Sequence, residues 1–343
     1  IKFASRTDAI PVLNAKASSL TFYEKGAWTL FVLHESIGDK AFKKAIKSYL
    51  KKYAFKNVNT QNFFDEIKKV SDFDVVQFQK TWLESTAFDT PTANALLSKN
   101  KAIKARLEVD KLKKTPLIEK IDFLKQTLDS DVHFSVKQAV ISQLQAEKYE
   151  NKKELLLKAL QQNNIQLRQT LAGTLPAIPE DFRKEYETLL DDKSYETQEI
   201  ALFYLWKNFP NHRKEYLDKS KEWIGFNDYN LRTLWLSLAL STPEYIEEPE
   251  KLINELVSFS TPEYEATTRQ NALEKLIAFK FINDAVLTNL VNATTHHMWQ
   301  FSKFGRETIR VLLKNSEMRT SFNRILPNLN PDEQFQLDRL LKE

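Results

Sequence analysis

The order of apolar and polar residues along the chain is typical of amphipathic helices. After Gly38, apolar residues recur three or four positions apart, which predicts a helix with one buried face. These residues are Phe42, Ala45, Ile46, Tyr49, Leu50 and Tyr53. Lysines fill the other positions and could bind an anion, but the balanced charge of the chain favours a solvated helix face. Asp39 is placed to cap this helix.

Three further helices complete an N-terminal group of four. They are expected to begin near Tyr23, Thr60 and Asp74. The stretch T-A-F-D-T-P at 86–91 then separates this group from the rest of the chain. Upstream, the stretch A-I-P-V-L looks extended and allows a short strand at Ile10–Leu13.

The remainder of the chain contains a weak internal repeat. Ten-residue segments such as S-V-K-Q-A-V-I-S-Q-L and Q-L-R-Q-T-L-A-G-T-L begin at 135, 166, 196, 230, 267 and 304, so they lie 30 to 37 residues apart. Helical hairpins stack at about this period, and each buries its apolar face on its neighbours. The sequence therefore predicts an all-α fold that ends in a helical-repeat array.

The third position of each repeated segment is polar. The six residues are Lys137, Arg168, Gln198, Arg232, Arg269 and Arg306. They could line one surface of the array, or they could terminate and solvate helices. We favour the second interpretation for most of them.

Several helices are expected to start at a Thr-Pro or Asn-Pro pair. The pentapeptide S-T-P-E-Y occurs twice, at 241 and 260, and Asn330-Pro331 has the same form. We expect the Thr or Asn to cap the helix and the Pro to occupy its first turn.

Composition excludes several classes of protein. The 343 residues carry a net charge of only +4, which disfavours nucleic acid as a partner. No apolar run approaches the roughly 20 residues of a membrane-spanning helix. The absence of cysteine excludes thiol catalysis and cysteine-bound zinc. The chain begins Ile-Lys-Phe, without an initiator Met or signal-peptide pattern, so we expect a fragment or a processed product.

The histidines do not form a zinc-peptidase helix. His34 and Glu35 begin such a motif, but two histidine ligands must lie four residues apart and position 38 is glycine. No other pair of histidines has that spacing, and the adjacent His296 and His297 would diverge by about 100° on a helix. We therefore expect no metal site made from this chain alone, and a surface or partly exposed position for His34.

Residues 22–42 nevertheless read F-Y-E-K-G-A-W-T-L-F-V-L-H-E-S-I-G-D-K-A-F, which resembles the M1 family of zinc aminopeptidases. The family shows Tyr-x-Lys-Gly-Ala/Gly, an apolar helix, and then Leu/Ile-Gly-Asp-x-x-Phe. The upstream D-A-I-P-V and the downstream F-Q-K-T-W, which ends at Trp82, fit as well. The resemblance covers roughly residues 5–85 and begins downstream of the helix that carries the family's zinc ligands.

This resemblance implies one catalytic residue, Tyr23. In the family, this tyrosine donates its hydroxyl to the oxyanion formed when water attacks the peptide carbonyl. A tyrosine hydroxyl is protonated at neutral pH and is a good donor. The alternative interpretation of Tyr23, which we would favour without its flanking residues, is a half-buried aromatic residue at the start of a helix. Gly26 is expected to allow close approach of neighbouring backbone, and no role is assigned to Lys25.

The resemblance also implies the organisation of the chain. Residues 1–88 would be the four-helix end of a thermolysin-like catalytic domain, and residues 89–343 a HEAT/ARM-like helical-repeat solenoid. The family's small β-sandwich is not expected, because T-A-F-D-T-P leads directly into helices. No cofactor is expected in this chain, whereas zinc is expected in the full-length parent. The partners would be a peptide substrate and the missing N-terminal and catalytic domains.

Two functions remain open. The chain is either the inactive C-terminal fragment of a metallo-aminopeptidase that removes N-terminal residues from peptides, or a free-standing repeat scaffold that binds a protein. In the first case, an arginine at the third repeat position could bind a substrate carboxylate. Arg232, Arg269 and Arg306 are candidates by position only.

Overall fold

The structure, a computed structural model, describes residues 10–343. The chain divides into two compact units between Lys104 and Ala105. The first two residues of the D-A-I-P-V stretch, Asp8 and Ala9, lie outside the described residues. The expected domain boundary after residue 88 stays a prediction.

Regular structure in residues 10–343 is entirely helical, so the predicted all-α fold is confirmed. The strand expected at Ile10–Leu13 is wrong. The Asn14 N–H donates to the Pro11 carbonyl over 3.1 Å, which closes a turn in its place.

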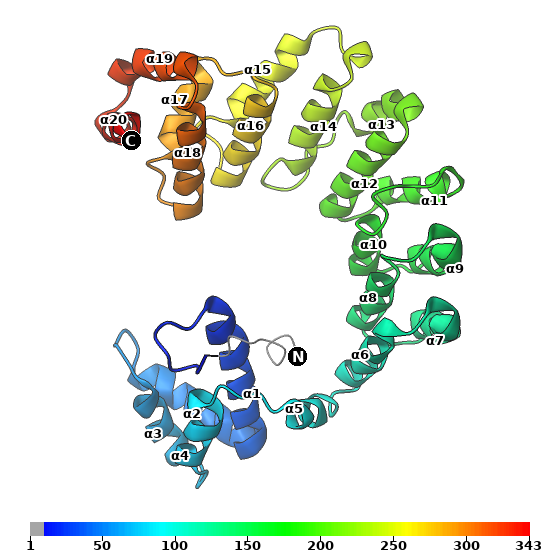
Figure 1. Ribbon diagram of the computed structural model, residues 1–343, viewed down its shortest axis with the longest axis vertical. Helices are drawn as coiled ribbons and strands as arrows, with labels where there is room; N and C mark the ends of the chain where they lie inside the picture. The colour runs from blue at the N-terminus through cyan, green and yellow to red at the C-terminus, as the bar shows by residue number, and fades with distance from the viewer. Residues whose placement is uncertain (1–9) are drawn as a thin grey trace. The chain divides into compact units, whose positions relative to one another are not determined.

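Unit 1 contains the four expected helices (Figure 1). Their apolar side chains form a small core. Its buried side chains include Leu33, Ala45, Phe64, Ile67 and Phe78. The α-helices are α1 (Gly26–Ile37), α2 (Asp39–Lys52), α3 (Thr60–Lys68), α4 (Val75–Phe78) and α5 (Thr90–Leu97), with π-helical turns η1 (Thr21–Lys25) before α1 and η2 (Gln79–Glu84) after α4. Helix α6 (Lys101–Lys111) spans the division between the units.

Unit 2 is built from helices in sequential pairs (Figure 1). The α-helices are α7 (Leu117–Asp129), α8 (Phe134–Gln143), α9 (Tyr149–Leu160), α10 (Ile165–Ala172), α11 (Arg183–Glu187), α12 (Tyr195–Asn208), α13 (Arg213–Ser220), α14 (Asn230–Leu240), α15 (Pro249–Phe259), α16 (Ala266–Ala278), α17 (Asp284–Ala293), α18 (Trp299–Leu312), α19 (Ser316–Ile325) and α20 (Pro331–Lys342). Short 3-10 turns lie between them: η3 (Leu112–Lys114), η4 (Glu180–Phe182), η5 (Thr188–Asp191), η6 (Pro210–His212), η7 (Pro243–Tyr245) and η8 (Leu326–Asn328).

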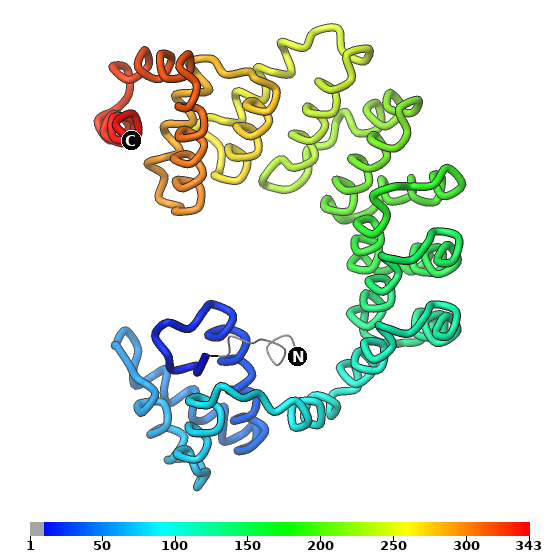
Figure 2. Tube along the Cα trace, viewed as in Figure 1, coloured from blue at the N-terminus to red at the C-terminus, as the bar shows by residue number. Residues whose placement is uncertain are grey.

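The pairs of unit 2 stack on one another as the repeat predicts. From α7 to α18, each odd-numbered helix packs on the even-numbered helix that follows it, and each even-numbered helix from α8 onward packs on the next even-numbered one. The tube view shows this succession of pairs within the unit (Figure 2). The six repeated segments fall on α8, α10, α12, α14, α16 and α18, one in each pair.

The third side chain of most repeated segments terminates the preceding helix. In five segments it donates to a main-chain carbonyl at or near that helix's end: Arg168 to Leu160 (2.9 Å), Gln198 to Leu190 (3.1 Å), Arg232 to Lys221 (2.7 Å), Arg269 to Ser260 (3.2 Å) and Arg306 to Thr294 (3.5 Å). In the sixth segment, Lys137 donates to the side chain of Gln162. Carbonyls at a helix end lack partners within the helix, and cations stabilise its negative end. The helix-terminating interpretation is confirmed for these five residues.

The two S-T-P-E-Y segments end helices and do not cap the following ones as expected. The Thr242 hydroxyl donates back to the Leu238 carbonyl of α14, and the Thr261 hydroxyl donates back to the Ser258 carbonyl of α15, each over 2.8 Å. By contrast, Asn330 caps α20 through a capping box, with Pro331 in the first turn, as predicted.

Candidate functional site

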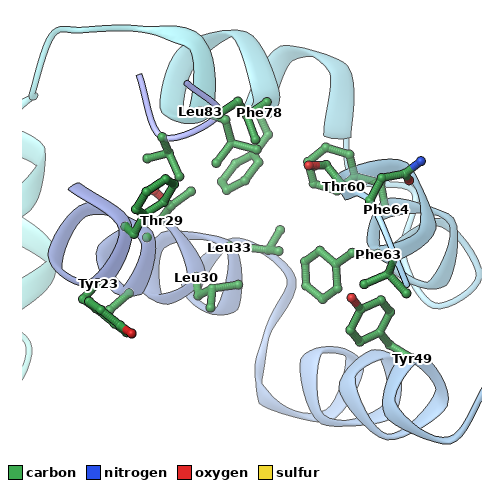
Figure 3. Close-up of a pocket in the computed structure, with 17 residues that line it drawn as sticks. Tyr23, Thr29, Leu30, Leu33, Tyr49, Thr60, Phe63, Phe64, Phe78 and Leu83 are labelled. Atoms are coloured by element: carbon green, nitrogen blue, oxygen red, sulfur yellow. The ribbon is translucent and has the colours of Figure 1, made fainter. Parts of the chain in front are cut away.

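Tyr23 lies at the rim of an apolar cavity in unit 1. The cavity has a volume of about 620 Å³, and its lining includes Leu30, Leu33, Phe63 and Phe78. Figure 3 shows these side chains facing one another while Tyr23 lies at one end of the group. The Tyr23 side chain is 78% exposed, so it is not the half-buried aromatic of the alternative interpretation. Among the described residues, its hydroxyl has no hydrogen-bond partner.

A π-helical turn presents Tyr23 at this rim. In η1, the Gly26 N–H donates to the Thr21 carbonyl five residues back and also to the Tyr23 carbonyl. This wide turn buries Thr21 and Lys25 and leaves Tyr23 outside. Single π-helical turns are frequent at functional sites. The arrangement offers a hydrogen-bond donor beside an apolar surface.

Lys25 is buried on the opposite side of this turn. Its side chain is 1% exposed, and its Nζ donates to the Ser85 carbonyl over 2.5 Å. Burial lowers the pKa of the Lys25 ammonium from its ordinary value. Sequence reasoning missed this burial, because a lysine in an amphipathic pattern is expected at the surface.

Gly26 does not have the role expected of it. A Cβ added there would meet no described atom within 4 Å, so the residue does not mark a close backbone approach. Gly26 instead lines the open cavity next to Tyr23.

The histidines are not arranged as metal ligands. His34 Nε2 lies 3.3 Å from Asp39 Oδ1, and its ring packs edge-on against Phe42. His296 and His297 lie between α17 and α18 and not on a helix, so their rings stack 4.2 Å apart instead of diverging. Across residues 10–343, no group of three potential ligands could hold a metal ion. The side chains present therefore do not fit a resident zinc ion.

The three arginines proposed for carboxylate binding differ in their availability. Arg232 forms a bidentate pair with Glu255, at 2.6 and 2.7 Å. Arg269 is 2% exposed and donates to Asn292 and to main-chain carbonyls. Arg306 is partly exposed, and within residues 10–343 its side chain makes only the long contact with Thr294. Two of the three candidates are thus engaged inside unit 2.

None of the described helices combines the length and the apolar character that crossing a bilayer requires.

Comparison with known proteins relates the segment that contains Tyr23 to aminopeptidases. Residues 15–82 match the family model described as "Peptidase family M1 domain". Aminopeptidase N of Lactococcus lactis subsp. lactis is 29% identical over 84 residues, which are 24% of this chain and 10% of that protein. Aminopeptidase M1-D of Oryza sativa subsp. japonica is 33% identical over 66 residues, 19% of this chain and 8% of that protein. Glutamyl aminopeptidase of Sus scrofa is 33% identical over 66 residues, 19% of this chain and 7% of that protein.

The matched part of the chain spans a tenth or less of the length of these three relatives. It contains η1, α1 and the core of unit 1, and it ends before the helical repeats of unit 2. Through residues 15–82, the chain is related to the M1 family of aminopeptidases.

Proposed function

We propose that this chain is part of an M1-type metallo-aminopeptidase that removes N-terminal residues from peptides, and that Tyr23 is its oxyanion donor. The observation that carries the proposal is the position of Tyr23: the family match covers it, and its exposed side chain lies at the rim of an apolar cavity. The family relationship implies zinc in the parent enzyme. Because residues 10–343 offer no fitting set of ligands, we further propose that the zinc-binding residues belong to a part of the protein outside this sequence and that the chain alone is inactive.

The role of Tyr23 follows from the charge that develops during peptide hydrolysis. When water attacks the peptide carbonyl, the carbonyl oxygen becomes an oxyanion, and a hydroxyl aimed at that oxygen stabilises the transition state. Such a donor is effective where water is excluded, and removing one costs about 10²–10³ in kcat. In this chain the hydroxyl is exposed. The proposal therefore requires other parts of the enzyme to enclose it.

The test is Tyr23→Phe in the full-length enzyme that contains this chain. We expect kcat to fall about 10²–10³-fold while KM and zinc content stay near their original values, because only a transition-state interaction is removed. Tyr195→Phe is the matched control, since Tyr195 is an exposed tyrosine of unit 2, and it should leave kcat unchanged. A Tyr23→Phe enzyme with normal kcat would remove the assignment.

The chain by itself should not hydrolyse peptides. We expect no release of 4-nitroaniline from aminoacyl-4-nitroanilides when the purified chain is incubated with zinc, whereas the full-length enzyme should release it. Zinc-dependent turnover by the chain alone would contradict the proposal.

A scaffold that binds a protein partner remains the second candidate. One observation favours it: on α18, Trp299 and Val311 are 64% and 63% exposed beside a hollow of about 450 Å³. Exposed aromatic residues are enriched where proteins bind one another. The coding sequence upstream of Ile1 distinguishes the two candidate functions. The peptidase requires a His-Glu-x-x-His motif there, and the scaffold predicts none.

A further inference from the structure

The π-helical turn that carries Tyr23 is fixed from inside unit 1 by a lysine. Lys25 is the last residue of η1, and its side chain is fully enclosed. The Nζ hydrogen bond goes to the carbonyl of Ser85, which is 60 residues away in the chain and is the C-cap residue of η2. The C-terminal end of a helix carries partial negative charge, so an ammonium group is favourable there.

Two local hydroxyl contacts lie before and after Lys25 in the chain. Thr29 Oγ1 donates to the Lys25 carbonyl over 2.7 Å, and Ser18 Oγ lies 3.4 Å from Thr21 Oγ1. Thr21 and Thr29 are each 3% exposed. The buried face of the turn is therefore held by polar contacts, while the face that carries Tyr23 has none among the described residues.

We propose that Lys25 is a positioning residue for Tyr23: by bonding the end of η2, it sets the place and direction of the Tyr23 hydroxyl. This inference rests on the proposed function of Tyr23. The two residues are separated by one position in the same turn, and the Tyr23 carbonyl accepts the Gly26 N–H that closes it. A movement of η1 against η2 would therefore move the Tyr23 ring. A displacement of about 1 Å at a reacting group can cost about 10²-fold in rate.

The experiment is a double-mutant cycle in the full-length enzyme with Tyr23→Phe and Lys25→Met. Methionine fills a similar volume without the ammonium. Lys25→Met alone should lower kcat about 10- to 100-fold with KM nearly unchanged. In the Tyr23→Phe background it should have no further effect on kcat, because the hydroxyl that it positions is already gone. Lys25→Arg, which keeps a cationic donor, should retain most of the kcat of the original enzyme.

Lys152→Met is the matched control. Lys152 is 5% exposed, and its Nζ donates to the Leu144 carbonyl at the end of α8 over 2.9 Å, so it repeats the chemistry of Lys25 in unit 2. This substitution should lower Tm but leave kcat unchanged in both backgrounds. If Lys25→Met does not fold, Lys25→Gln, which is shorter and uncharged, takes its place in the cycle.

Each outcome gives a separate answer. If Lys25→Met lowers kcat equally in both backgrounds, the positioning role is wrong and the proposed function stands. If Tyr23→Phe has normal kcat, the proposed function fails and the positioning role fails with it. Loss of activity confined to the background that retains the Tyr23 hydroxyl supports the inference.

Discussion

At the scale of single residues, a buried carboxylate joins two helices of unit 1. The Glu66 side chain of α3 is fully buried and accepts hydrogen bonds from Lys69 at 2.5 Å, Ser48 at 2.6 Å and Lys52 at 2.9 Å. These bonds lower the pKa of Glu66 to about 2, with the bond from Lys69 contributing most. Since Ser48 and Lys52 belong to α2, the carboxylate connects α2 and α3.

This cluster predicts an acid-sensitive contribution to stability. The folded-state pKa of Glu66 lies below its ordinary value of 4.5, so the stabilisation is complete above that pH and is lost as the pH falls toward 2. Glu66→Gln should lower Tm at pH 7. The difference in Tm between this variant and the original protein should shrink as the pH falls from 4.5 to 2. Glu108→Gln is the control, because Glu108 forms an exposed pair with Lys111 and should change little. A Tm difference that stays constant with pH would contradict the prediction.

Residue roles were predictable only where a short motif specifies them. The stretch from Tyr23 to Gly26 identifies the candidate catalytic residue without any tertiary structure. Lys25 and Glu66 were not predictable, because their burial depends on partners up to 60 residues away. A charged residue in a helical pattern is expected at the surface unless such partners are known.

At the scale of elements, one glycine sets the connection between α1 and α2. Gly38 has φ of +82° and ψ of 157°, a conformation open almost only to glycine. Gly38→Ala should therefore lower the free energy of unfolding by about 1–3 kcal/mol. Gly26→Ala at the other end of α1 should raise it by about 0.4–1 kcal/mol, because Gly26 has helical angles and room for a Cβ. Denaturant unfolding measures the free energy of unfolding of both variants. A change of the same sign and size in Gly38→Ala and Gly26→Ala would contradict the prediction.

Helices were easier to predict than their ends. Apolar spacing located α1 to α4, and the internal repeat located the even-numbered helices from α8 to α18. The Thr-Pro signals misled because a threonine hydroxyl can bond either to the helix that follows or to the one before, as Thr242 and Thr261 do. The divergence of His296 and His297 holds only on a helix, and the two residues lie in the turn between α17 and α18.

At the scale of the whole molecule, unit 2 is an array in which each pair depends on its neighbours. Leu202 in α12 is fully buried, so Leu202→Ala should cost about 2–5 kcal/mol. Hydrogen exchange should quicken most in α12 and in α10 and α14, which pack on it, and least in α18, further along the array. Phe203→Ala on the same helix removes a partly exposed ring and should have a smaller effect. Uniform quickening along unit 2 would contradict local coupling.

The array was foreseeable because its period lies in the sequence, whereas the domain boundary expected after residue 88 stays a prediction. The repeated segments reveal one helix of each pair, and stacking follows from their apolar faces. The division between Lys104 and Ala105 falls inside α6, where helical spacing continues and no turn residues mark a break.

The hydrogen bonds that end the odd-numbered helices have a consequence for how such an array can change in length. Arg168, Arg232 and Arg269 each donate to a carbonyl of their own pair. A pair copied by tandem duplication would thus carry its own terminating arginine. Arg168 and Arg269 also reach the following pair, through Asp192 and Asn292. Adding or removing a whole pair, in evolution or in protein engineering, would therefore keep this terminating bond within each pair.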